Sequence, residues 1–127
     1  MNKNFNNKNI LLIDDDGDTH LEMREMFKQT NSNLLSAQSG EEGLEVYKNE
    51  EVDLVLLDMN IPGMSGYDTL VKLKEIDYHA DVIMCSTNTD LKERAYKMGA
   101  AAYLPKPINL NSLLHIIDVL FKLPKMG

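Results

Sequence analysis

The sequence has little cysteine and no long apolar stretch, and both absences restrict where the protein can work. The single cysteine, Cys85, excludes an intramolecular disulfide and any zinc site built on several cysteines. A membrane-spanning helix needs roughly 18 consecutive apolar residues, and apolar runs such as 54–57 are far shorter. The run at 10–13, which follows two lysines, is too short for a signal peptide. We therefore expect a soluble protein of a reducing compartment, the cytoplasm, without membrane insertion.

Positive charge is also scarce. Twenty Asp and Glu residues against thirteen Lys and Arg residues leave a formal net charge of −7. An acidic surface repels phosphate backbones, so we expect no direct binding to nucleic acid. The hydrophobic fraction of 43% is ordinary for a globular chain, and 127 residues suffice for one domain. We expect a single domain over 1–127 with a core at about 9–122 and loose tails at 1–9 and 124–127.

Short apolar segments alternate along the chain with segments of helical spacing. The apolar segments predict five buried strands, at 10–13, 33–38, 52–57, 82–85 and 101–104. The segments between and after them predict helices at 18–30, after residue 39, and at 66–76, 91–98 and 110–121. Ser39 and Glu42 form a capping box, and Gly99 predicts the end of the fourth helix. Five such units predict an α/β fold, a doubly wound five-stranded parallel sheet with helices on both faces.

Several predicted strands lead into residues that carry chemistry. These are Asp14, Asp15 and Asp16 after the first strand, Asp58 after the third, Ser86 and Thr87 after the fourth, and Lys106 after the fifth. In doubly wound sheets the ligand site lies at the carboxyl ends of the strands. Two carboxylates about 4 Å apart repel by roughly 4 kcal/mol at an effective dielectric near 20. The cluster therefore needs a counter-charge, and oxygen ligands favour Mg²⁺. The ion and Lys106 could together hold a phosphoryl group, with Asp58 as nucleophile and Ser86 as hydrogen-bond donor.

Five stretches of the chain resemble the receiver domain of the two-component response regulators, which has a flavodoxin-like fold. They are 10–16, 53–66, 85–86, 99–100 and 106–107, and the resemblance extends over about 9–122. The resemblance implies that Asp58 accepts a phosphoryl group from a histidine kinase or a phosphotransfer protein. It implies further that Asp15 and Asp58 bind Mg²⁺ or Mn²⁺ directly, with the backbone carbonyl of Asn60, while Asp14 acts through water. Such a domain promotes only its own phosphorylation and dephosphorylation, so we expect no separate enzyme activity.

The same resemblance implies a switch. Lys106 is expected to pair with the phosphoryl oxygens, and the peptide bond before Pro107 is expected to be cis. Ser86 would move toward the phosphoryl group and let Tyr103 turn inward; the alternative is a Tyr103 at the rim with its hydroxyl group in water. The signal would reach a downstream protein through the face built from the fourth helix, the fifth strand and the fifth helix. A homodimer that forms on phosphorylation stays an open alternative.

One position departs from the pattern of this family. The residue after the switch hydroxyl is usually Ala or Gly, whereas this chain has Thr87. A β-branched side chain beside the phosphoryl group narrows the approach of water, which predicts a longer-lived acyl phosphate. The alternative is that Thr87 points its methyl group into the core and has no kinetic effect.

Two interpretations of the output stay open. A stand-alone receiver of the chemotaxis or sporulation type docks to other proteins, whereas the receiver of a larger regulator serves an attached DNA-binding or enzymatic module. No helix-turn-helix or catalytic segment follows Phe121, which favours the stand-alone form. An N-terminal fragment of a larger regulator would have the same appearance.

Two other protein classes fit the first acidic loop poorly. An EF-hand calcium loop that starts at Asp14 would need a glycine where Thr19 stands. A haloacid-dehalogenase-like phosphatase also uses an aspartate nucleophile, but its motif needs Thr or Val where this chain has His20 or Asp18. Both alternatives are therefore disfavoured.

The remaining chemically versatile residues have structural interpretations. We expect Cys85 to fill space on a buried strand, where an apolar site raises the thiol pKa. The methionines, such as Met23, are expected to fill the core. Three histidines, His20, His79 and His115, are expected at the surface, because the acceptor of a receiver domain is a carboxylate.

Overall fold

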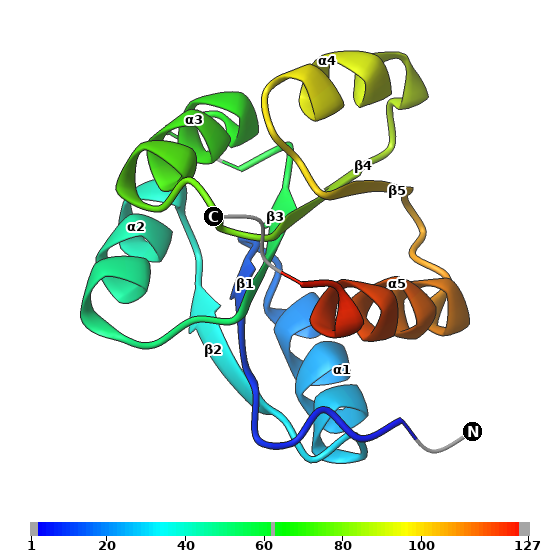
Figure 1. Ribbon diagram of the computed structural model, residues 1–127. Coiled ribbons are helices and arrows are strands. Elements are labelled where there is room, and N and C mark those ends of the chain that lie inside the picture. The colour runs from blue at the N-terminus through cyan, green and yellow to red at the C-terminus, as the bar shows by residue number, and fades with distance from the viewer. Residues whose placement is uncertain (1–2, 62, 125–127) are drawn as a thin grey trace.

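The five predicted strands form one parallel sheet in the computed structural model, which describes residues 3–61 and 63–124. The elements are, in chain order, β1 Asn9–Ile13, α1 Gly17–Lys28, β2 Asn33–Ala37, α2 Gly40–Asn49, β3 Leu54–Asp58, α3 Gly66–Ile76, β4 Val82–Ser86, the 3-10 turn η1 Thr89–Leu91, α4 Lys92–Lys97, β5 Ala102–Pro105 and α5 Leu110–Lys122. The strand order is β2-β1-β3-β4-β5, with α1 and α5 on one face and α2, α3 and α4 on the other (Figure 1). This is the order of a doubly wound sheet, so the predicted fold class is confirmed.

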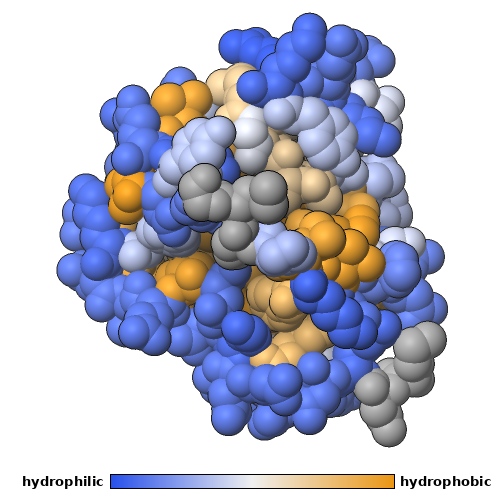
Figure 2. Space-filling model, in the orientation of Figure 1, coloured by the Kyte–Doolittle hydropathy of each residue, from blue (hydrophilic) through white to orange (hydrophobic). Residues whose placement is uncertain are grey.

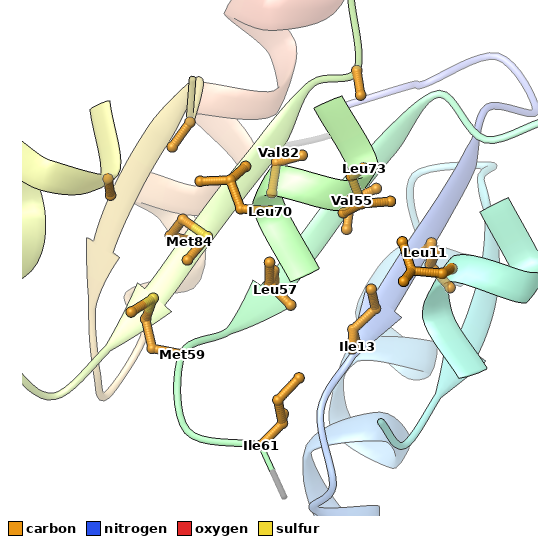
Figure 3. Packing of buried hydrophobic residues seen from close by; sticks show 14 of the residues in the cluster. Leu11, Ile13, Val55, Leu57, Met59, Ile61, Leu70, Leu73, Val82 and Met84 are labelled. Carbon is orange, nitrogen blue, oxygen red and sulfur yellow. The ribbon is translucent and has the colours of Figure 1, made fainter. Parts of the chain in front are cut away.

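Alternate strand residues point into two hydrophobic layers. In β3, Val55 and Leu57 face α2, α3 and α4, whereas Leu54 and Leu56 face α1 and α5. All four side chains are at most 1% exposed, as expected for a parallel sheet covered on both faces. Figure 3 shows the first of these layers, in which Leu70 of α3 packs over the strands.

Polar side chains begin most of the helices. The side-chain oxygen of the N-cap residue accepts a backbone N–H from the first turn; these residues are Asp16 in α1, Ser39 in α2, Ser65 in α3 and Asn109 in α5. The predicted cap of α2 is confirmed, with Oγ of Ser39 accepting the N–H of Glu42 at 3.1 Å. The N-cap of α4 is Leu91, and no side-chain hydrogen bond caps this helix.

The bounds of most elements differ from the prediction by one or two residues. β3 begins at Leu54 rather than at residue 52, and it extends to Asp58. The helix predicted at 91–98 is α4, Lys92–Lys97, which agrees to within one residue at each end. It is preceded by the 3-10 turn η1, in whose N-cap the side chain of Asn88 accepts the N–H of Asp90. Gly99, with a φ of +102°, ends α4 as predicted. Within the described chain, no helix is long and apolar enough to cross a membrane.

The N-terminal segment 3–8 is docked on the molecule, which corrects the predicted loose tail. Phe5 is 3% exposed and lies in the hydrophobic layer beneath α1 and α5. Its N–H donates to the carbonyl of Thr30 at 2.7 Å, and its ring meets that of Phe121 edge to face with centroids 5.4 Å apart. The core therefore begins at Phe5 rather than at about residue 9. Phe5 is buried although its neighbours in the chain are polar, because its ring packs against apolar surface of α5.

Hydrophilic residues cover most of the surface in the view of Figure 1, and hydrophobic ones gather over α5 (Figure 2). Val119 and Leu123 contribute exposed apolar surface there, at 41% and 56% exposure. Of the predicted C-terminal tail, Pro124 is exposed, whereas residues 125–127 lie outside the described residues, as do residues 1–2.

Candidate functional site

Four adjacent strands carry the predicted site residues to one edge of the sheet. Asp58 and Ser86 are the last residues of β3 and β4, and Asp14 directly follows β1. Lys106 follows β5, and its N–H donates to the carbonyl of Ser86 at 2.9 Å. The strand order places β1, β3, β4 and β5 side by side, so the prediction that these residues converge is correct.

The ammonium group of Lys106 lies between two buried carboxylates. Its Nζ is 3.0 Å from Oδ1 of Asp58 and 3.7 Å from Oδ2 of Asp14. Burial by itself disfavours the ammonium, but the hydrogen bond and the negative charge of Asp58 outweigh it and raise the pKa of Lys106. The side chain therefore stays charged at neutral pH and supplies a fixed cation at this edge of the sheet.

Three carboxylates share the site with this lysine. One oxygen from each of Asp14, Asp15 and Asp58 lies within 4.8 Å of the others. Burial raises the pKa of Asp14, the hydrogen bond from the N–H of Asp16 opposes that rise, and the charge of Asp58 adds to it. Three negative groups against one ammonium leave excess negative charge, and hard carboxylate oxygens at this spacing suit Mg²⁺ or a similar ion. The residues present therefore fit the metal that the sequence predicts.

The segment after β3 turns sharply beside Asp58. Oδ1 of Asp58 accepts the N–H of Asn60 at 3.1 Å, which places the backbone of Asn60 next to the carboxylate. Gly66 then approaches so closely that a Cβ atom there would lie 2.7 Å from the Cα of Met59. Glycine is required at that position because any side chain would push this segment away from the site.

The peptide bond between Lys106 and Pro107 is cis. A groove of about 260 Å³ opens beside it, between α1 and the segment that follows β5. It is lined by Asp16, Thr19, Glu22, Met23, Lys106, Pro107 and Ile108. The site therefore has an open approach on the α1 side.

His20 is buried, which corrects its predicted place at the surface. It is 7% exposed, and its Nε2 lies 2.7 Å from the carbonyl oxygen of Asp14. Helical spacing could have found it, because His20 precedes the buried residues Met23 and Phe27 by three and seven positions in α1. The other two histidines, His79 and His115, are exposed as predicted.

The loop after β4 connects the site to α4. Ser86 is 1% exposed, and its Oγ accepts the N–H of Asn88 at 3.0 Å. Tyr103 is 5% exposed, points inward and donates its hydroxyl hydrogen to the carbonyl of Asn88, so the rim position with the hydroxyl in water is wrong. Thr87 is exposed, so the alternative that buries its methyl group in the core is also wrong.

Cys85 lies on β4 beside the site but points into the layer under α1 and α5. It is 4% exposed, and burial raises the pKa of its thiol to about 12. The buried position confirms that Cys85 fills space in the core, and a thiol with such a pKa is protonated at neutral pH. Met23 and Met26 are buried, as predicted.

The EF-hand alternative is excluded by local structure. Helix α1 begins at Gly17, within the twelve residues from Asp14 that a calcium loop would need. Asp16 is the N-cap of this helix, and its carboxylate accepts hydrogen bonds from Asp18 N–H and Thr19 Oγ1 at 3.0 and 3.1 Å. These residues therefore form a strand-to-helix turn.

Comparisons with known proteins agree with this geometry. The family model described as response regulator receiver domain matches residues 10–118. The chain is 31% identical to sporulation initiation phosphotransferase F of Bacillus subtilis, over 84% of this chain and 88% of that protein. It is 33% identical to the chemotaxis protein CheY of Halobacterium salinarum, over 89% of this chain and 97% of that protein.

Solved structures and longer relatives add to these matches. A chain in the crystal structure of the CheX–CheY–BeF3–Mg²⁺ complex from Borrelia burgdorferi aligns with a TM-score of 0.84 and 30% identity, covering 90% of this chain and 89% of that one. The chain is also 31% identical to the cell cycle transcriptional regulator CtrA of Caulobacter vibrioides, of which it spans about half, 51%. A receiver-type module therefore occurs among these relatives both nearly alone and within longer proteins.

Proposed function

Because the chain belongs to the response regulator receiver domain family, we propose that Asp58 accepts the phosphoryl group in a phosphorylation-dependent signalling step. The observation that carries this proposal is the position of Asp58. Its carboxylate ends a central strand, 3.0 Å from Nζ of Lys106 and beside the carboxylates of Asp14 and Asp15. Asp14, the other carboxylate of the cluster beside Lys106, lies farther from the ammonium, with its Oδ2 3.7 Å from Nζ. A haloacid-dehalogenase-like phosphatase is not supported, because the family match is to receiver domains.

The proposed reaction transfers the phosphoryl group from a phosphohistidine of the donor. An oxygen of the Asp58 carboxylate attacks the phosphorus, an O–P bond forms, and the N–P bond breaks with its electron pair returning to the imidazole nitrogen. Oδ1 of Asp58 accepts hydrogen bonds from Lys106 and from the N–H of Asn60, which orients the carboxylate and favours Oδ2 as the nucleophile. Lys106 then pairs with the phosphoryl oxygens of the product, an acyl phosphate.

Receiver domains bind Mg²⁺ at their acidic pocket, and for this chain we assign the ligands to particular residues. Asp15, Asp58 and the backbone carbonyl of Asn60 would hold Mg²⁺ or Mn²⁺ directly, and Asp14 would act through water. When bound, the ion neutralises the negative charge that gathers on the phosphoryl oxygens. Lys106 would supply a second positive charge, with its Nζ 3.0 Å from Oδ1 of Asp58.

A phosphoryl group on Asp58 would compete for the hydroxyl group of Ser86. That hydroxyl accepts the N–H of Asn88, whose carbonyl in turn accepts the hydroxyl hydrogen of Tyr103. Movement of Ser86 would therefore displace the loop that leads into α4. We assign the output to the α4–β5–α5 face, with a coupling of about 1–3 kcal/mol between the phosphoryl group and the state of this face.

Receiver domains interact with histidine kinases or phosphotransfer proteins and with downstream targets. For this chain we propose a protein target on the α4–β5–α5 face, where Lys92 and Lys97 make the surface less acidic than the molecule as a whole. Catalysis is limited to the chain's own phosphorylation and dephosphorylation. The similarity to half of the longer CtrA supports a second form of the proposal, in which the same face acts on an attached module.

The test is phosphorylation by acetyl phosphate in the presence of Mg²⁺, followed by intact-protein mass spectrometry. We expect each chain to gain one acid-labile phosphoryl group, and Asp58→Asn to gain none. Asp53→Asn serves as the matched control, because Asp53 directly precedes the other end of β3, where its carboxylate accepts the N–H of Asn9. Full labelling of Asp58→Asn would refute the assignment.

A further inference from the structure

His20 is a buried polar side chain that the proposed reaction leaves without a role. It lies in the first turn of α1 and is 7% exposed. Among the described residues, its Nδ1 is the buried side-chain nitrogen or oxygen atom that has no hydrogen-bond partner. Burying a polar ring in this way costs free energy that an apolar side chain would not cost. Any favourable role of the ring must therefore come from the contact of its other nitrogen, Nε2.

That nitrogen, Nε2, lies 2.7 Å from the backbone carbonyl oxygen of Asp14. A carbonyl oxygen can only accept a hydrogen bond, so Nε2 carries the hydrogen and donates it. The bond runs from the first turn of α1 back to the residue that follows β1. It therefore closes a ring of chain that contains Asp15 and Asp16.

The turn at 14–16 is also held by its own side chains. Oδ1 of Asp14 accepts the N–H of Asp16 at 2.9 Å, and Asp16 in turn caps α1. Asp15 is exposed, so the backbone of the turn, rather than packing of its side chain, sets the position of its carboxylate. His20 adds a short hydrogen bond to this backbone from a residue outside the turn.

We propose that His20 is a positioning residue for the divalent cation: its Nε2–H fixes the backbone that presents Asp14 and Asp15 to the ion. This inference rests on the metal site proposed above. It assigns no proton transfer to the ring and no contact with the phosphoryl group. Hydrogen bonds that orient metal ligands typically contribute about 10- to 100-fold to metal affinity. Because His20 acts through the backbone, we expect the lower end, about tenfold.

Three substitutions of His20 distinguish the effect of its Nε2–H donor from the effect of the imidazole ring as a whole. His20→Gln places an amide nitrogen about as far from the backbone as Nε2, His20→Asn places it only as far as Nδ1, and His20→Leu has no donor. We expect the Kd for Mg²⁺ to rise about tenfold in His20→Asn and His20→Leu, and less than about twofold in His20→Gln. The titration follows the NMR signals of the Asp15 and Asn60 backbone amides, so its readout is independent of phosphorylation.

A matched control removes a buried hydrogen bond at the other end of α1. Thr30→Val deletes the hydroxyl group that donates to the carbonyl of Phe27 at 2.8 Å. We expect it to lower the unfolding temperature but to leave the Kd for Mg²⁺ unchanged. A rise in Kd equal to that of His20→Asn would overturn the proposal, because general loss of stability would then explain both.

The remaining outcomes separate this inference from the metal site itself. Equal Kd values in wild type and in the His20 variants would overturn the role of His20, as would failure of His20→Gln to restore affinity. If His20→Leu does not fold, the pair His20→Gln and His20→Asn decides the matter. If the wild type binds no Mg²⁺, or if Asp15→Asn leaves the Kd for Mg²⁺ unchanged, the proposed metal site is overturned and this inference with it.

Discussion

Two regions of the molecule differ in what holds them: α1 and α5 cover one face of the sheet as long capped helices, whereas α4, beside α2 and α3 on the other face, is short and held by hydrogen bonds. Helices α1 and α5 have 12 and 13 residues, both begin with a side-chain cap, and Phe5 completes the layer beneath them. Helix α4 on the opposite face has six residues, and no side-chain hydrogen bond caps it. The first face is therefore held mainly by buried apolar area, which does not change when one polar contact changes.

Tyrosine side chains supply much of what holds the α4 region. The hydroxyl of Tyr67 in α3 donates to the carbonyl of Leu91 at 3.0 Å, and that of Tyr103 donates to the carbonyl of Asn88. Tyr96 of α4 accepts the N–H of Tyr103 at 3.2 Å. A hydrogen bond contributes about 1 kcal/mol, so this region can rearrange at a cost that a phosphoryl group can supply. The difference teaches that the α1–α5 face anchors the fold together with α2 and α3, whereas the switch is built on the α4 region.

The largest expected effect comes from the anchored face. Phe5→Ala should lower the free energy of unfolding by about 3–5 kcal/mol, because it removes a buried ring and leaves a cavity against Phe121. Urea denaturation measures the loss. Tyr78→Ala, at a ring that is 79% exposed, is the control and should cost much less. A loss below about 0.5 kcal/mol for Phe5→Ala would mean that the N-terminal segment does not anchor this face.

The next effect concerns the loop between the site and α4. Thr87→Ala should speed hydrolysis of the acyl phosphate by up to about tenfold, equivalent to about 1.4 kcal/mol, because a smaller side chain widens the approach of water. The exposed position of Thr87 leaves its side chain on the solvent side of the loop. Dephosphorylation rates of wild type and Thr87→Ala test this. An unchanged or slower rate in the variant would show that Thr87 does not shield the site.

The acidic cluster lies at the carboxyl edge of the sheet, and the buried carboxyl group of Asp14 there makes the stability of the fold depend on pH. Burial raises the pKa of Asp14 above its ordinary value of 3.8. A carboxyl whose pKa is higher in the folded than in the unfolded protein costs stability once the pH rises through these values. In metal-free buffer, Asp14→Asn should therefore stabilise the fold by about 1 kcal/mol at pH 7, and the gain should fade as the pH drops toward 3.8.

Thermal unfolding in the presence of a chelator, measured across this pH range, gives the comparison. Glu45→Gln removes an exposed charge in α2 and serves as the control. A gain for Asp14→Asn that did not depend on pH would contradict the assignment to charge, since a packing effect has no such dependence.

The smallest expected loss of stability comes from the α4 region, and faster local motion should accompany it there. Tyr67→Phe removes the hydrogen bond to Leu91 and keeps the ring, over which the guanidinium of Arg94 stacks at 4.4 Å. We expect a loss of about 1 kcal/mol in unfolding free energy and faster hydrogen exchange confined to η1 and α4. Hydrogen exchange measured by NMR tests this. Equal acceleration in α1 and α5 would show that the two faces are not independent.

Patterns within single elements explain why most of the fold could be predicted. The strands near the centre of the sheet are continuous apolar runs such as 54–57, which is what burial on both faces requires. Ser39 caps α2 and Gly99 ends α4 through interactions with their own neighbours in the chain, so their effects are readable locally. The least accurate bounds were those of α1 and β3, whose ends differ from the prediction by one or two residues, whereas the helix predicted at 91–98 agrees with α4 to within one residue at each end.

The sequence by itself determined which residues meet at the site. Asp14, Asp58, Ser86 and Lys106 stand at the ends of strands, and the parallel order of those strands brings their carboxyl ends to one edge. This inference needs only the alternation of strand and helix, because each position is fixed by its own strand and not by distant contacts.

Only the tertiary structure decided the contacts of Phe5, His20 and Tyr103, although helical spacing already places His20 on the buried side of α1. Phe5 docks because α1 and α5 leave apolar surface for it, His20 turns inward to the carbonyl of Asp14, and Tyr103 reaches the carbonyl of Asn88. Each of these side chains is amphipathic or lies in a polar segment, so its burial depends on whether a partner from another part of the chain is within reach. Such partners are set by the packing of helices on the sheet, and the local pattern of the sequence does not contain that information.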